Sequence, residues 1–312
     1  MPDDLKLHHP WLVAVWPGMG HVASSAGYYL MAQLRVKMLA EFSPRELFDL
    51  EHVEVKNGLM QPVRLPRSRM FLWRDPREQH DIVIFIGEAQ PPIGRYPFCR
   101  QLVEYAKQLG VERVFTFAAM ATDMHPEHES RVFAAATDEE MLASLRARRL
   151  ELVEDGHISG LNGVLVGVAA EAGLRGACLL GEMPHIFSQL PFPKATLAVL
   201  KVFTEMARIE IDFTELTEQA DAMSERLGEL LSEAQKAIAN RLGGDSEEEE
   251  EEFKPELPDE EERLSPADEQ RIERLFDQAQ SNRAKAYELK RELDRLEIFD
   301  EYENRFLDLF KK

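Results

Sequence analysis

Two hydrophobic patterns alternate along the first two thirds of the chain. Short, continuous apolar runs lie at 11–16, 82–86, 114–117 and 177–180. Runs of this kind are typical of strands that are covered on both faces, as in a parallel sheet. Apolar residues at steps of three and four predict helices over 21–40, 98–109, 138–148, 161–172 and 194–207. The alternation predicts an α/β fold with a mainly parallel sheet flanked by helices.

Shorter strands are expected between these elements. Within 51–73, residues 52–55 alternate between polar and apolar positions, Asn57-Gly58 is a strong hairpin signal, and 70–73 are continuously apolar, so a meander with antiparallel strands is predicted there. Residues 131–134 are expected to form one more short strand. We expect the strand at 177–180 to end at Gly181-Glu182-Met183-Pro184, which would place a carboxylate at the edge where open α/β sheets bind ligands.

The last third of the chain predicts a helical annex. Nearly heptad spacing indicates a long amphipathic helix over 213–241, and six consecutive glutamates, Glu247–Glu252, predict a disordered linker. Ser265 is placed to cap the next helix. We predict an α/β domain at 1–211, a long helix at 212–243, an acidic linker at 244–264 and a helical or coiled-coil segment at 265–312. Truncation after Gly243 is expected to leave a folded body but to change assembly or the capture of a partner.

Composition and charge narrow the range of partners. The net charge of −20 argues against nucleic acid and anionic membranes. Only two cysteines occur, Cys99 and Cys178, which suits a reducing compartment. The apolar run at 11–16 is too short for a signal peptide, and none reaches the roughly 20 residues of a membrane span. We therefore expect a cytoplasmic protein.

Several polar side chains follow the predicted parallel strands and would share one edge of the sheet. This candidate ligand-binding pocket consists of Gly18, Gly20, His21, Glu88, Thr122, His125, Asn162 and Glu182. Two carboxylates and a histidine would suit acid–base chemistry. The alternative is that Glu88 and Glu182 only cap backbone N–H groups at neighbouring helix starts.

Other chemical motifs are weaker. Gly18, Gly20 and Ala23 fit a loose dinucleotide-binding fingerprint, but Glu41, at the right distance for its acidic member, is predicted to end a helix. A solvated loop is favoured over a metal site for His125 and His128, because Pro126 lies between them. No catalytic residue, metal or cofactor can be assigned.

Separated motifs, in this order, resemble the proteasome assembly chaperone family in its PAC-two domain type. They are Gly18-Met19-Gly20-His21, Gly87-Glu88-x-x-Pro91, Tyr96 before a Cys-Arg-Gln helix, Ile158–Gly163 and Gly181–His185. The likeness spans roughly residues 10–210. It implies a phosphorylase-like, three-layer fold and a homo-oligomer, trimeric or larger. Some relatives handle proteasome subunits, and bacterial-type members mostly lack an assigned activity.

Two classes of function follow from these observations. The first is a non-enzymatic, oligomeric factor that binds a client protein, which the resemblance and the amphipathic tail favour. The second is an enzyme or sensor that binds a nucleoside- or phosphate-bearing ligand at the predicted edge pocket, which Gly18-Met19-Gly20 and the paired glutamates favour.

Overall fold

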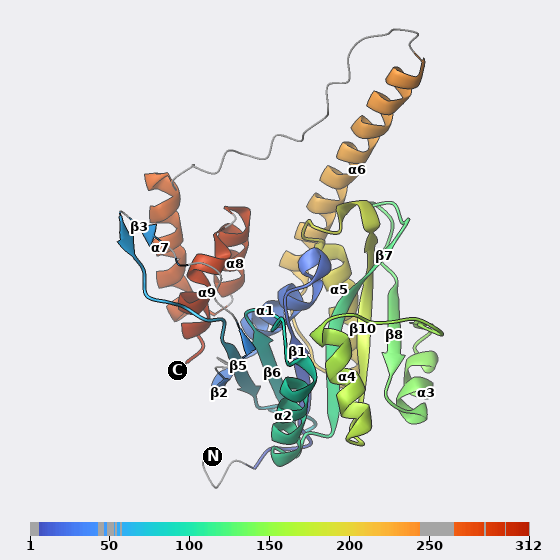
Figure 1. Cartoon of the computed structure of the whole chain (residues 1–312), viewed down its shortest axis with the longest axis vertical. Coiled ribbons are helices and arrows are strands. Elements are labelled where there is room, and N and C mark those ends of the chain that lie inside the picture. The colour runs from blue at the N-terminus through green and yellow to red at the C-terminus, as the bar shows by residue number, and fades with distance from the viewer. Residues whose placement is uncertain are drawn as a thin grey trace.

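The fold is a three-layer sandwich of helices around a mixed sheet, seen in a computed structural model of the whole chain (Figure 1). The structure describes residues 6–42, 47–48, 53, 55–56, 58–243, 265–283, 285–296 and 298–311. The expected linker at 244–264 and Asn57 of the expected hairpin turn lie outside these residues. Within them, no helix is both long and apolar enough to span a bilayer.

The sheet has eight strands in the described part of the chain, in the order β2-β5-β6-β1-β7-β10-β8-β9. Their bounds are β1 Trp11–Val15, β2 Lys37–Phe42, β5 Ser68–Trp73, β6 Ile82–Gly87, β7 Arg113–Thr122, β8 Val132–Ala136, β9 Glu151–Leu152 and β10 Arg175–Pro184. The central strands β6, β1, β7 and β10 are parallel. Strand β5 pairs antiparallel with β2 and β6, β8 pairs antiparallel with β10, and β9 pairs parallel with β8. A separate hairpin joins β3 Val55–Lys56 to β4 Leu59–Met60. The predicted fold class is confirmed.

Helices cover both faces of the sheet. Their bounds are α1 Val22–Gln33, α2 Arg95–Gln108, α3 Glu139–Ala147, α4 Leu161–Glu171, α5 Pro193–Ala207, α6 Thr214–Gly243, α7 Pro266–Ser281, α8 Lys285–Arg295 and α9 Phe299–Asp308, with 3-10 turns η1 Met19–His21 and η3 His185–Phe187. Buried residues of α1, α3 and α5 share one apolar core, and those of α2 and α4 pack against the opposite face. Burial raises the pKa of the Cys99 thiol to about 12 and that of Cys178 to about 11, so both behave as structural side chains.

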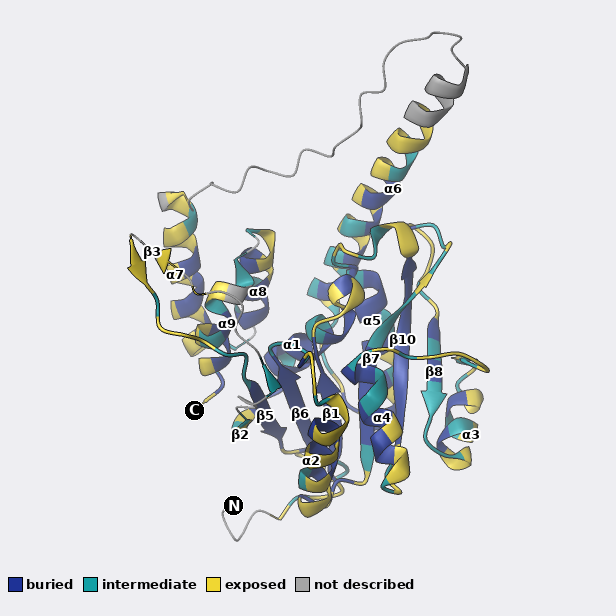
Figure 2. Cartoon of the chain, viewed as in Figure 1, coloured by how far each residue is buried: buried dark blue, intermediate teal, exposed yellow. Residues whose placement is uncertain are grey.

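Helix α1 is apolar on nearly every side, which requires a cover on both of its flanks. One flank packs on the sheet and the other meets the annex formed by α7, α8 and α9 (Figure 2). Tyr28 stacks edge-on against Phe299 and Phe306, and its hydroxyl donates to Glu303. Tyr29 meets the ring of Tyr287 at a centroid distance of 4.5 Å. Annex and body therefore share one continuous core.

The end of the chain also shields one edge of the sheet. Edge strand β2 carries a register shift between Met38 and Ala40, and the Met38 N–H donates to the carbonyl of Phe310 at 3.1 Å. At the opposite edge, β9 is only two residues long. Both edges thus carry features that discourage further strand pairing.

Two sequence-based expectations about element bounds are wrong. The helix expected over 21–40 ends at Gln33, and Lys37–Phe42 form strand β2. Between the two elements, the Leu34 N–H donates a hydrogen bond to Leu30 O at the end of the helix, and the Val36 N–H donates one to Leu34 O in a tight turn, each at 2.8 Å. The helical spacing in the sequence extends to Met38 because Met38 is also an apolar residue that packs on the core, but it does so from strand β2.

The strands expected at 114–117 and 177–180 are also longer than predicted. Strand β7 runs to Thr122, and β10 runs to Pro184. The polar residues Thr122 and Glu182 fit inside these strands because they hydrogen-bond to each other across the parallel pair. Glu182 is therefore a strand residue and does not follow the strand.

Candidate functional site

The carboxyl ends of β1, β6, β7 and β10 lie at a common edge of the sheet, because all four strands are parallel. This is the edge at which the sequence places its eight candidate residues. In the structure these eight residues do not form one cluster but belong to several separate groups of interacting side chains.

The Gly18–His21 turn is closed by its own backbone. Gly20 has a φ of 61°, and an added Cβ would lie 2.6 Å from Met183 Sδ, so only glycine fits. The Gly20 N–H donates to Ser188 O, and the His21 N–H donates to Gly18 O, each at 3.0 Å. These two donors are satisfied inside the protein and do not face an anion.

The loose dinucleotide-binding fingerprint, a weak motif in the sequence, is not formed either. Glu41 lies in β2, which is separated from β1 by β5 and β6, instead of ending a helix. Its carboxylate pairs with Arg67 and Arg69, at 3.4 and 3.2 Å. A dinucleotide fold needs the acidic residue on the strand beside the glycine turn, and that arrangement is missing.

Asn162 belongs to the support beneath the Gly18 turn. Its side-chain oxygen accepts a hydrogen bond from the Trp16 N–H at 3.3 Å, and its backbone carbonyl accepts one from Thr116 Oγ1. A Cβ on Gly18 would lie 3.7 Å from Asn162 Nδ2. Asn162 therefore joins the start of α4 to strands β1 and β7.

Glu182, Thr122 and Arg131 form a second group, on the sheet face that α4 covers. Glu182 is only 2% exposed and accepts from Thr122 Oγ1 at 2.8 Å and from Arg131 Nε and Nη2 at 2.8 and 2.6 Å. These hydrogen bonds from Arg131 lower the pKa of the Glu182 carboxyl below its ordinary value. The carboxylate is thus held ionised by a dedicated partner.

Glu88 lies at the same edge but on the opposite face. It accepts from the Arg67 N–H at 2.8 Å and meets Arg69 Nη1 at 3.3 Å. Side chains two residues apart in a strand point to the same face of the sheet. Arg69 therefore points to the α1 side, like Phe71 of β5, and Glu182 points to the α4 side, like Leu180 of β10. The two strands that carry the glutamates are also separated by β1 and β7, about 14 Å in all.

The two glutamates therefore do not converge on one pocket, which corrects the sequence-based picture of paired carboxylates. The alternative of helix caps is wrong as well, because both glutamates pair with arginines. Glu88 accepts a hydrogen bond from the Arg67 backbone N–H, and Glu182 accepts one from the Arg131 backbone N–H. A ligand-binding role for the eight residues remains a prediction, now for separate groups of them.

His125 and His128 lie in the loop after β7, as expected, with ring centroids 5.4 Å apart. Lys194, buried in the first turn of α5, holds this loop by donating to the carbonyls of Pro126, Glu127 and His128 at 3.0 to 3.3 Å. Among the residues that the structure describes, no group of three His, Cys, Asp or Glu side chains could hold a metal ion.

Three basic residues that organise these groups were not singled out from the sequence. Arg69 interrupts the apolar face of the Ser68–Trp73 strand, and a charge at an inward position is a usable signal of a buried ion pair. Arg131 and Lys194 carry no such signal, since each acts through a partner more than 50 residues away.

A large cavity lies beside the edge, between α6 and the annex. Its volume is about 1,880 Å³, and His21 and Glu88 from the predicted set contribute to its lining. In Figure 1, α6 and α8 stand on the same side of the body with α1 beneath them. We call this cavity the α6–α8 groove. Its floor consists of α1, the loop around Leu190 and apolar side chains of α6 and α9, and its walls are α6 and α8.

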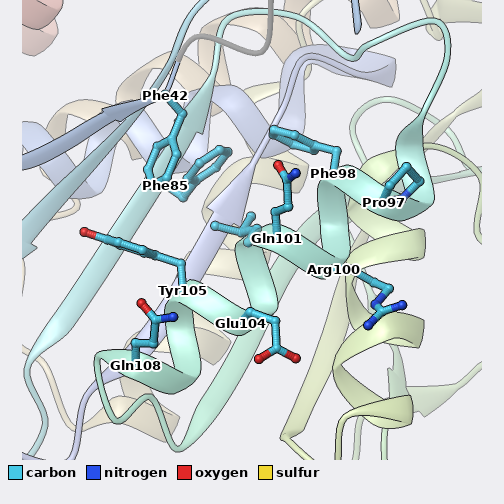
Figure 3. Close-up of a pocket in the computed structure, with 10 residues that line it drawn as sticks. Phe42, Phe85, Pro97, Phe98, Arg100, Gln101, Glu104, Tyr105 and Gln108 are labelled. Carbon is cyan, nitrogen blue, oxygen red and sulfur yellow. The ribbon is translucent and has the colours of Figure 1, made fainter. Parts of the chain in front are cut away.

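A second, smaller cavity of about 460 Å³ lies along α2 (Figure 3). Aromatic rings of Phe42, Phe85, Phe98 and Tyr105 line it, and the Phe42 and Tyr105 rings meet edge to face at 5.2 Å. Its rim carries Gln101, Gln108, Arg100 and Glu104. Apolar walls with a few polar rim groups suit a small ligand or a single apolar side chain.

Lowering the pH is expected to remove the stability that Glu182 contributes. Because Arg131 lowers the pKa of Glu182 in the folded state, this contribution is complete above the unfolded value of about 4.3 and is lost as the pH falls through the lower folded pKa. Glu182→Gln should cost about 1–3 kcal/mol of unfolding free energy near neutral pH. Urea unfolding as the pH is lowered below about 5 should then show a shallower decline than in the wild type.

Glu151→Gln is the matched control, because Glu151 pairs with the same Arg131 at 2.8 Å but is largely exposed. It should cost less than about 1 kcal/mol. Equal losses for the two variants would contradict the role given to Glu182.

Comparison with known proteins shows which family has this architecture. The sequence profile described as the PAC2 family matches residues 12–231. An uncharacterized protein of Methanocaldococcus jannaschii is 27% identical over 231 residues, which cover 72% of this chain and 83% of that protein.

Solved structures agree with the profile. PbaB of Pyrococcus furiosus, described as an archaeal proteasome activator, is 26% identical with a TM-score of 0.62, over 73% of this chain and 96% of PbaB. A PAC2 family protein from Streptomyces avermitilis is 27% identical with a TM-score of 0.62, over 71% of this chain and 95% of that protein. The annex lies beyond the profile match.

Proposed function

Because the chain belongs to the PAC2 family, we propose that it is a non-enzymatic factor that binds a client protein in the manner of an assembly chaperone. The observation that carries the proposal is the likeness to PbaB, which extends over almost the full length of that proteasome activator. The corresponding client is a subunit or assembly of the proteasome core. The proposal includes a homo-oligomer, a trimer or larger, and a cytoplasmic location.

The contacts at the carboxyl edge support a binding role. Glu88 and Glu182 are each occupied by an arginine, and the donors of the Gly18–His21 turn are used within the fold. General acid–base catalysis needs a group with a proton to exchange at the working pH, and an ion-paired carboxylate with a lowered pKa, such as Glu182, does not supply it.

The test is direct binding. The full chain is mixed with purified proteasome core α and β subunits of the same organism, and complexes are followed by native mass spectrometry and light scattering. We expect a complex of defined stoichiometry with a Kd of about 10 µM or tighter. Absence of any complex with free subunits and with the assembled core would overturn the proposal.

A small-molecule site is the second candidate, favoured by the aromatic cavity along α2. Its volume of about 460 Å³ lies within the range of about 300–1,000 Å³ typical of ligand pockets. A ligand of this cavity should raise the melting temperature of the wild type, because binding to the folded state stabilises it. The same ligand should lose its effect with Tyr105→Ala.

A further inference from the structure

The α6–α8 groove differs in size from a metabolite pocket. At about 1,880 Å³ it exceeds the volume range of about 300–1,000 Å³ typical of small ligands. Two helices, α6 and α8, form its walls, and amphipathic helices of partner proteins commonly bind in grooves between helices. Size and shape favour a polypeptide segment.

The bottom of the groove carries a cluster of apolar side chains, beside Ser24, Ser25 and Tyr28 of α1. Leu227 and Met223 of α6 and Phe299 of α9 contribute to the lining, together with Leu190 from the loop after η3. Leu230 continues the α6 stripe toward the open end and is 44% exposed. Side chains at these spacings are those against which an amphipathic helix lays its own apolar face.

The rims of the groove are basic, although the chain carries a net charge of −20. Arg226 on α6 and Arg291 on α8 line the two facing walls, and further arginines line the mouth: Arg64, Arg95, Arg271 and Arg295. Arg226 and Arg64 have no ion pair within the described residues.

The acidic groups of the lining are mostly satisfied within the fold. Glu292 is buried between Arg271 and Arg295, Asp294 pairs with Lys290 at 2.6 Å, and Glu303 accepts from Tyr28. Glu218 is exposed on the α6 wall. Arg226 keeps its charge free for a partner on the α6 side, and Arg291 on the α8 side has one long contact, 3.8 Å, with Glu215, which leaves its hydrogen-bond donors available.

From this juxtaposition we infer that the α6–α8 groove binds an acidic amphipathic helix of the client polypeptide. Apolar residues of that helix pack on the groove floor, and carboxylates on its flanks pair with Arg226 and Arg291. The inference rests on the proposed function, since it names the part of the molecule that holds the client. Nucleic acid is not the occupant, because the chain as a whole repels polyanions.

The probe is a labelled synthetic peptide of about 18 residues, about 27 Å long as a helix. It carries leucines at steps of three and four and glutamates on the flanks; a second peptide has lysine in place of every glutamate. With the full chain, fluorescence anisotropy should show saturable binding of the glutamate peptide that weakens with added salt. The lysine peptide should not bind.

The variant Arg226→Glu/Arg291→Glu should weaken binding of the glutamate peptide about tenfold or more, because two attractive contacts become repulsive. Leu230→Ser should weaken it through the groove floor. Arg146→Glu/Arg149→Glu is the matched control, since it reverses two exposed arginines at the end of α3, outside the lining of the groove, and should leave the affinity unchanged. Circular dichroism verifies that each variant is folded.

Equal affinity of the groove and control variants would overturn the inference, as would binding of both peptides alike. Binding seen only after Glu247–Glu252 are replaced by serine would make this chain's own acidic run the occupant and would also overturn it. The same variants are measured against proteasome subunits. If the wild type binds a subunit and the groove variant binds it equally well, the groove inference fails while the proposed function stands; if the wild type binds none, the proposed function itself fails.

Discussion

A chain that ends at Gly243 is expected to lose its folded, monodisperse state. The annex buries Phe276, Leu293, Phe306 and Phe310 in the same core as Tyr28 of α1, and each large side chain contributes about 1.5–3 kcal/mol when fully buried. The sum for these four side chains, about 6–12 kcal/mol, is as large as the total stability of about 5–15 kcal/mol that a native protein has. Light scattering and thermal unfolding should show an aggregated or unfolded body, contrary to the expectation from sequence alone.

A cleavage experiment provides the control. A specific protease site placed between Gly244 and Leu264 allows the chain to be cut after it has folded. We expect the annex to remain bound to the body on gel filtration, because their contacts are those of a shared core. Release of the annex from a body that stays folded and monomeric would instead support the separate domains predicted from the sequence.

Arg69→Ala is expected to cost about 3–5 kcal/mol of unfolding free energy. Arg69 is 0% exposed and joins three parts of the fold: Glu41 of β2, Glu88 after β6 and Asn304 of α9. Its removal leaves the carboxylate of Glu88, with only 8% of its side chain exposed, without its closest charged partner. Urea unfolding of the purified variant measures the loss.

Arg67→Ala is the comparison variant, because Arg67 pairs with the same two glutamates from a position that is 30% exposed. A partly solvated pair of this kind contributes about 1 kcal/mol or less. Similar losses for Arg67→Ala and Arg69→Ala would show that burial does not set the strength of this network. Replacing Arg69 and Glu88 together by apolar residues should recover much of the loss.

Much of the architecture follows from local pattern. Continuous apolar runs identify the parallel strands because a strand covered on both faces has no polar side. Ser265 caps α7 as predicted, accepting from the Asp268 N–H at 3.1 Å, because a capping contact spans only three residues. The common edge of the four parallel strands is likewise a consequence of their direction.

The site depends on information that local pattern lacks. Glu88 and Glu182 share an edge, yet the face to which each points depends on register and on arginines from other strands. The α6–α8 groove depends on where the annex docks, because its walls are about 65 residues apart in the chain. The helix expected over 21–40 failed for the same reason: Met38 is buried by partners distant in sequence.

The contact between the Met38 N–H and the Phe310 carbonyl bears on how copies of this chain could meet. A bare, flat border strand is a template for fibril growth, since each newcomer satisfies the previous one's open backbone groups. Here the C-terminal residues already occupy part of that template, and the opposite border offers only two residues. Association of copies of this chain through strand pairing is thus disfavoured, and loss of the residues around Phe310 would make the protein more prone to polymerise through its backbone.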